Sequence, residues 1–202
     1  PANSNLPYSD INYNHGTHVA GIIGAEGNNG TGTTGVTWDT QLMSLDVFNG
    51  SDGAYDSDII DAIYYAADNG ADVINMSLGS TYEYTTIVDW RIFDPNGYSA
   101  YYEALSYAVN QGSTIVVAAG NEDAHAGTHL SIPAAFSSVI DGVISVAAIT
   151  NTGDLTEYSN YGSLVTVAAP GGSHDEGTGI LSTVPTGRYE GMPGTSMASP
   201  IV

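Results

Sequence analysis

The sequence has 202 residues, of which 42% are hydrophobic and 12% charged, and it contains no cysteine. These values fit one globular domain with a single core, and they exclude disulfides, thiolate metal sites and a cysteine nucleophile. With 22 acidic residues against two basic ones, the net charge is −20, which disfavours nucleic acid and anionic membranes as partners. The acidic surface either serves solubility or reflects a salty medium, in which screening relieves self-repulsion.

The first element with a clear pattern contains two histidines. Residues 14–21 read NHGTHVAG, and the apolar residues that follow His15 alternate with glycines. This pattern predicts a helix packed closely on a sheet. A histidine can act as a general base near neutral pH. A metal site is the alternative for two histidines three positions apart, but the pattern offers no carboxylate or thiol to complete it.

A glycine-rich segment follows this helix. Residues 26–35 read EGNNGTGTTG, a composition that can turn several oxygen atoms toward a hard cation. Asn28 and Asn29 are the candidate ligands. A surface turn without a metal is the alternative.

Strands and helices then alternate. Strands are predicted at 41–48, 72–78, 114–119, 143–149 and 164–169, and helices at 57–69 and 99–111. This rhythm predicts a parallel sheet with right-handed crossovers. The expected fold is therefore α/β, with three αβα layers around a mainly parallel, doubly wound sheet.

Two further segments carry reactive groups. Asn121 directly follows a predicted strand, at the sheet edge where active sites of such folds lie, and its amide could hold an oxyanion. Residues 194–200 read GTSMASP, where a glycine turn could present the hydroxyl of Ser196 as a nucleophile. A hydroxyl needs an adjacent base, which a histidine can supply.

The segments 14–21, 118–122 and 194–200 resemble the histidine, oxyanion-asparagine and serine motifs of the subtilisin-like serine peptidases. They occur in that family's order, and the resemblance runs through nearly the whole chain. It implies a serine endopeptidase in which His15 is the base, His18 supports it, Ser196 is the nucleophile and Asn121 holds the oxyanion. It also implies a structural calcium ion near Asn28.

The resemblance further implies a substrate groove. Ser77, Leu78 and Gly79 would pair with the substrate backbone. The specificity pocket would be formed by Ala118, Ala119, Gly120 and Ser131, with a cis bond before Pro133. Glu122 would disfavour acidic side chains next to the cleaved bond. The connection 79–98 is longer than in typical members, and we expect its aromatic residues to influence substrate preference.

One part of the expected triad is missing. The subtilisin order is Asp, His, Ser, yet the only acid before His15 is Asp10, which lacks the strand setting of the family's aspartate. We therefore expect the aspartate upstream of Pro1, so that residues 1–202 are a single catalytic domain truncated at both ends. The expected partners are polypeptide substrates and a propeptide, without nucleic acid or membrane. The expected protein is an extracellular monomer.

Three other function classes differ from this one in what they require of the chain. A pseudopeptidase that only binds extended peptides would need a broken triad. A processing peptidase would cleave one dedicated precursor instead of many polypeptides. An esterase of the α/β-hydrolase type is disfavoured, because residues 194–198 do not read Gly-x-Ser-x-Gly and the histidine precedes the serine.

Overall fold

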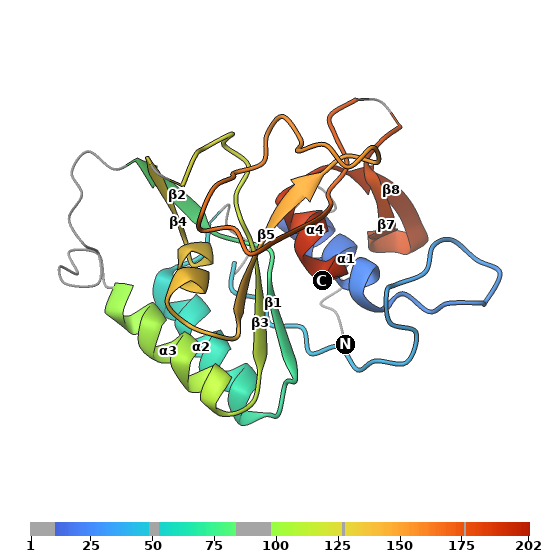
Figure 1. The fold of residues 1–202 in the computed structure, drawn as a ribbon. Coiled ribbons are helices and arrows are strands. Elements are labelled where there is room, and N and C mark those ends of the chain that lie inside the picture. Colours follow the sequence, from blue (N-terminus) through green and yellow to red (C-terminus); the bar gives the residue numbers. More distant parts are fainter. Residues whose placement is uncertain (1–10, 49–52, 84–97, 127, 176) are drawn as a thin grey trace.

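A computed structural model describes residues 11–48, 53–83, 98–126, 128–175 and 177–202. Its central sheet has four parallel strands (Figure 1), in the order β1 (Val73–Met76), β3 (Thr114–Ala118), β5 (Val143–Ile149) and β6 (Val167–Pro170). The strands predicted at 72–78, 114–119 and 143–149 are confirmed, whereas the one predicted at 164–169 begins only at Val167.

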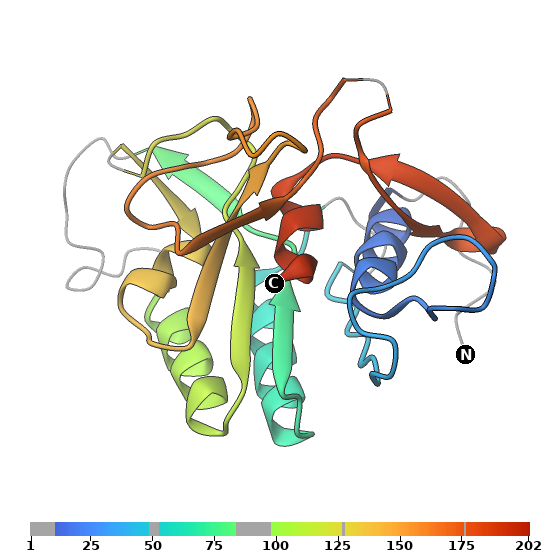
Figure 2. The same ribbon diagram turned by 45° about the vertical axis from the view of Figure 1, so that its right-hand side comes forward.

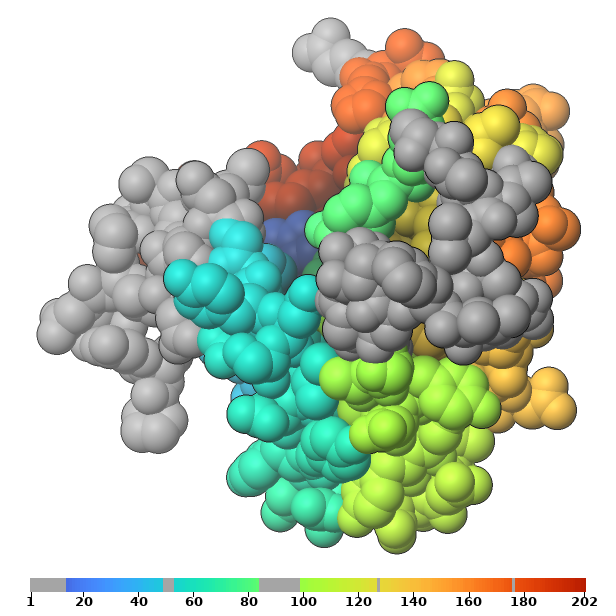
Figure 3. Space-filling model, turned by 90° about the vertical axis from the view of Figure 1, so that its left-hand side faces the viewer, coloured from blue at the N-terminus to red at the C-terminus, as the bar shows by residue number. Residues whose placement is uncertain are grey.

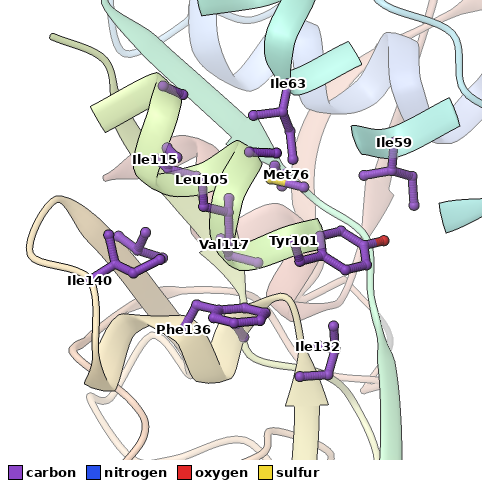
Figure 4. Packing of buried hydrophobic residues seen from close by; sticks show 14 of the residues in the cluster. Ile59, Ile63, Met76, Tyr101, Leu105, Ile115, Val117, Ile132, Phe136 and Ile140 are labelled. Atoms are coloured by element: carbon purple, nitrogen blue, oxygen red, sulfur yellow. The ribbon is translucent and has the colours of Figure 1, made fainter. Parts of the chain in front are cut away.

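Two helices cover one face of the sheet. They are α2 (Asp56–Asp68) and α3 (Tyr98–Asn110), each within one residue of its predicted bounds. Alternate residues of β3, Ile115 and Val117, pack with Ile63, Leu105 and Phe136 in the main core (Figure 4), as expected for a strand buried on both faces. The part of the chain that the structure describes has no helix long and apolar enough to span a bilayer.

The opposite face of the sheet is covered by the C-terminal segment. Val116 of β3 and Ala148 of β5 pack against Ala198, which ends the short helix α4 (Thr195–Ala198), and η3 (Ser199–Ile201) follows directly. Helix α1 (Ile11–Gly24) packs on this segment, where Val19 and Ile22 of α1 cluster with Met197 of α4. The three-layer αβα architecture is thus confirmed, with a helical layer on each side of the sheet (Figures 1 and 2).

Two small antiparallel sheets lie outside the central one. One pairs β2 (Ser80–Glu83) with β4 (His129–Ile132), and the other pairs β7 (Ile180–Val184) with β8 (Arg188–Met192). The short 3-10 helix η1 (Ala134–Ser138) follows β4, and the 3-10 helix η2 (Pro185–Gly187) joins β7 to β8. A Cβ atom on Gly21 would collide with Ser182 and Thr183, so the predicted close packing of α1 is on β7 rather than on the central sheet.

The strand predicted at 41–48 is wrong. These residues form no strand, and Leu42, Met43 and Leu45 are exposed. The segment runs on the side of β1 away from β3 (Figure 2). Because β1 is an edge strand, and because 59% of the Val73 surface is exposed, this side of the sheet has an open edge. Because no described strand pairs with residues 41–48, this apolar segment cannot form the hydrogen bonds between strands that a sheet requires.

Candidate active site

Helix α1 carries both histidines of the first motif. His18 is fully buried, and its Nε2–H donates to the Glu190 carbonyl at 2.9 Å. The hydroxyls of Ser182 and Thr183 donate to the His18 and Thr17 carbonyls at 2.7 and 3.0 Å. The β7–β8 hairpin therefore fixes the turn of α1 that follows His15.

His15 itself is half-buried one turn before His18. Burial lowers the pKa of His15 below 6.5, and repulsion from His18 lowers it further. The imidazole is therefore neutral at neutral pH, which is the form that can accept a proton. No hydrogen bond joins His15 to a carboxylate in the described ranges, and Asp10 lies outside them.

The buried His18 predicts a specific pH dependence of stability. Burial lowers the pKa of His18, although the hydrogen bond to Glu190 partly offsets this. The unfolded chain therefore binds a proton at a higher pH than the folded chain does, so stability is complete above pH ~6.5 and falls as the pH drops below it. Urea unfolding of the full-length protein between pH 7.5 and 5 should show this slope. We expect a shallower slope for His18→Gln and an unchanged one for the exposed control His125→Gln; equal slopes in all three proteins would contradict the prediction.

Ser196 lies in α4, directly after a turn at Gly194. The φ of Gly194 is +150°, a value in the region that side chains disfavour. The Ser196 hydroxyl makes a long 3.4 Å contact with the Ser77 carbonyl, and the Ser77 hydroxyl donates to the Ser196 carbonyl at 2.8 Å. Asn75 and Ser199 complete the hydrogen bonds of the Ser77 hydroxyl at 3.0 and 2.9 Å. The Ser77 hydroxyl thus fixes α4, and Ser77 is not among the residues that line the pocket described below.

The side chain of Asn121 is held by the residue before Ser196. Its Oδ1 accepts hydrogen bonds from both the backbone N–H and the hydroxyl of Thr195, at 2.8 and 2.9 Å. The Thr195 hydroxyl in turn accepts the Gly120 N–H at 3.2 Å. Because Oδ1 is the acceptor, the Nδ2 donors of Asn121 are directed away from Thr195 and are available to a ligand.

A single pocket brings most of the predicted site residues together. Ser196, Asn121 and Glu122 line it together with predicted subsite residues, namely Leu78, Gly79, Ala118, Gly120 and Ser131. Ala119 lines a neighbouring cavity instead, and Ser131 lines both. The bond before Pro133 is cis, as expected.

The histidine and the serine come from helices that pack together, but they are not hydrogen-bonded to each other. The hydroxyl of Ser196 is directed to Ser77 instead. Figure 3 shows the dark blue first turns of α1 between the cyan start of α2 and the green chain of β2, below the red C-terminal segment. Helix α1 and the C-terminal segment are therefore both visible on this face of the molecule.

The glycine-rich loop supplies only part of a calcium site. Asn28 and Asn29 are exposed, and Oδ1 of Asn29 accepts the Thr31 N–H at 2.9 Å. In the described ranges no group of three or more His, Cys, Asp or Glu side chains could hold a metal. The loop therefore offers one carboxylate, that of Glu26, and otherwise neutral oxygens, whereas calcium sites normally include several carboxylates.

The sequence interpretation missed two residues of this region. Thr195 orients Asn121, and Asn160 contacts Glu122 and Ser131 from beneath the pocket. Thr195 could have been suspected because it precedes the candidate nucleophile. Asn160 belongs to no recognised motif, and nothing in the sequence links it to residues about 40 positions away.

Comparison with known proteins gives the same picture over the whole chain. The protein-family model described as the subtilase family matches residues 3–202 of this chain. A thermophilic serine proteinase of Bacillus sp. strain AK1 is 42% identical over 96% of this chain and 41% of its own length. An extracellular protease of Xanthomonas campestris pv. campestris is 38% identical, over 93% of this chain and 31% of its own length.

Solved structures agree with these relatives. A protease of Pseudoalteromonas arctica PAMC 21717 superposes with a TM-score of 0.77 at 35% identity, covering 93% of this chain and 55% of that one. The chain thus spans about half or less of the length of each of these three proteins. The profile match over 200 of 202 positions, together with the order of the three motifs, establishes that the chain belongs to the subtilase family.

Proposed function

We propose that the complete protein is a serine endopeptidase that cleaves polypeptides through an acyl-enzyme. The observation that supports this most strongly is the shared pocket of Ser196 and Asn121, in which Thr195 fixes the amide with its donors available. A nucleophile beside a preorganised amide donor is the arrangement that acyl transfer requires.

Three residues, His15, Ser196 and Asn121, carry out the steps of this mechanism. His15 accepts the Ser196 proton while the Ser196 Oγ attacks the peptide carbonyl. Asn121 Nδ2 and the Ser196 backbone N–H donate to the oxyanion. His15 then protonates the leaving amine, and a water molecule, activated by the same imidazole, hydrolyses the acyl-enzyme. The Ser196 hydroxyl must leave the Ser77 carbonyl to meet the imidazole.

The proposal includes a carboxylate from outside the described residues, expected upstream of Pro1. It would orient His15 and stabilise its protonated form. Two features of the described part favour a further segment here: the open edge of β1, and the buried atom Asn75 Oδ1, which has no hydrogen-bond partner among the described residues. A full-length sequence without an acid upstream of Pro1 would contradict this point.

The proposed partners are polypeptide substrates and a propeptide, and the proposed location of a monomeric protein is extracellular. The name of the Xanthomonas relative supports the location. The charge of −20 argues against nucleic acid. The aromatic residues proposed to shape the subsites fall mostly in 84–97, outside the described residues.

Labelling of the full-length protein with a fluorophosphonate probe, together with hydrolysis of denatured polypeptides, tests the proposal. A peptidase reacts with the probe and cleaves many polypeptides. Peptide binding without labelling would instead indicate a pseudopeptidase. Cleavage of only a few members of a peptide library would favour a dedicated processing enzyme.

We also propose that the loop 26–35 binds a structural calcium ion, with a carboxylate from outside the described residues. Calcium at ~100 times its Kd should then raise the melting temperature of the full-length protein by about 5–10 °C, and EDTA should reverse this. Asn29→Ala should weaken the response, and Asn151→Ala, in an exposed turn elsewhere, should not. A melting temperature that does not change when calcium is added would contradict the proposal.

A further inference from the structure

The loop that carries Asn121 has no regular structure of its own. Residues 119–124 follow β3 without forming a helix or a strand, and residues 121–123 are exposed. Gly120 and Asp123, which flank Asn121, have φ angles of +107° and +51°, unlike the negative values of helices and strands. Such a loop cannot satisfy its backbone groups within itself, so partners elsewhere in the chain must hold it in one conformation.

Asn160 supplies these partners. Its side chain is 5% exposed. Its Oδ1 accepts the backbone N–H groups of Glu122 and Ala124 at 3.1 and 2.9 Å, and its Nδ2 donates to the Ala119 carbonyl at 3.0 Å. One carboxamide thus holds the loop both before and after Asn121.

The packing around this carboxamide leaves room for no other arrangement. The backbone N–H of Asn160 donates to the Gly120 carbonyl at 3.0 Å, and a Cβ atom on Gly120 would collide with Asn160 Nδ2. The same Nδ2 lies 2.8 Å from Glu122 Oε2 and 2.9 Å from Ser131 Oγ. A buried amide whose donors and acceptor are all used is rigid, so the loop has one well-defined position.

This position determines where the oxyanion donor lies. Thr195 fixes the rotation of the Asn121 amide through the bonds to Oδ1, whereas Asn160 holds the backbone that carries this amide. Asn160 itself does not line the pocket of Ser196 and Asn121, so it can affect the reaction only through the loop. The bonds to an oxyanion depend strongly on geometry, and a displacement of about 1 Å can cost as much as 10²-fold in rate.

We propose that Asn160 is a positioning residue for acyl transfer, which fixes residues 119–124 so that Asn121 Nδ2 meets the oxyanion. The inference rests on the proposed peptidase function, because it concerns how the same site is held. Asn160→Ala keeps the Asn121 amide but releases the loop on both sides of it. The variant should therefore cost less activity than removal of the amide itself.

Thr156 offers a matched control for the stability that Asn160→Ala also removes. It is 2% exposed, and its hydroxyl donates to the Ala148 carbonyl of β5 at 3.2 Å. Valine has the same branched shape without the hydroxyl. Thr156→Val therefore removes a buried hydrogen bond four positions before Asn160 without affecting the bonds of residues 119–124.

The kinetic test uses the full-length protein and one peptide substrate. We expect Asn160→Ala to lower kcat by about tenfold with little change in KM, because the oxyanion forms only after the substrate has bound. Thr156→Val should lower the melting temperature but leave kcat unchanged. The double variant of Asn160→Ala and Asn121→Leu should be no slower than Asn121→Leu alone.

Two kinetic results would overturn the inference. One is an unchanged kcat in Asn160→Ala, and the other is an additive loss in the double variant, which would mean that Asn160 does not act through Asn121. If Asn160→Ala does not fold, the same criteria apply to Asn160→Ser, which keeps one hydroxyl in the polar cluster.

Hydrogen exchange separates this inference from the proposed function. Asn160→Ala should accelerate amide exchange in residues 119–124 by about tenfold, and Thr156→Val should not. Accelerated exchange in a protein that cleaves no peptide and does not react with a fluorophosphonate would refute the peptidase proposal but support the role of Asn160 in holding the loop. Unchanged exchange in residues 119–124 would overturn the inference, whatever the activity of the protein.

Discussion

Replacing Ser196 with alanine should lower kcat of the full-length protein by about 10⁶-fold and abolish labelling by a fluorophosphonate. The size is that measured for the nucleophile of subtilisin, a member of the same family. It is so large because without Oγ no acyl-enzyme can form, and His15 then has no proton to accept. Within the described ranges the Oγ makes only the long contact with Ser77, so the melting temperature should change little.

Ser199→Ala is the matched control for this substitution. It removes a buried hydroxyl three positions later, which hydrogen-bonds Ser77 at 2.9 Å. We expect a loss of stability of about 1 kcal/mol, typical of a buried hydrogen bond, with labelling retained. Residual labelling of Ser196→Ala at the original rate, or loss of labelling in Ser199→Ala at full stability, would contradict the assignment of the nucleophile.

The fold was predictable where the local pattern of residues matched what the core requires. Helices α2 and α3 each have a continuous apolar stripe and a following glycine, Gly70 or Gly112, and both were predicted to within one residue. The β-branched residues of β3 and β5 similarly identified buried strands. In these segments a residue's own neighbours along the chain determine its structure.

Prediction failed where structure depends on a partner. The segment 41–48 has the composition of a strand, but the described part of the chain gives it no neighbouring strand, so its apolar residues stay exposed. The β7–β8 hairpin packs on α1 through β7, whereas β8 is almost entirely exposed, so its formation depends on a helix more than 150 positions earlier. Composition cannot reveal whether a neighbour is present.

The same contrast holds within the candidate site. The three motifs made His15, Asn121 and Ser196 candidates directly, because each motif is a contiguous run of residues. Thr195 and Asn160 could not be assigned a role from sequence, since their hydrogen bonds reach residues 74 and 38 positions away. Motifs identify reacting groups, whereas the residues that orient those groups are found from geometry.

Asn121→Leu should lower kcat by about 10²–10³-fold while changing KM little. This range was measured for an oxyanion donor of subtilisin, and we transfer it because Asn121 lines the same pocket as Ser196. Leucine keeps the approximate size of the side chain but donates no hydrogen bond to the charged intermediate. It also removes the Oδ1 acceptor of the buried Thr195, so the melting temperature should fall as well. Steady-state kinetics on a single peptide would measure the effect, and an unchanged kcat would exclude Asn121 from the oxyanion site.

The Thr195→Val variant tests whether the side-chain amide of Asn121 must be held in one orientation. Valine removes the hydroxyl bond to Oδ1 but keeps the 2.8 Å backbone bond, so kcat should fall by only about tenfold, equivalent to about 1.4 kcal/mol. Because Thr195 would act through Asn121, the double variant should be no slower than Asn121→Leu alone. Additive losses would mean that Thr195 contributes independently, through the turn that carries Ser196, and that the amide is oriented by other contacts.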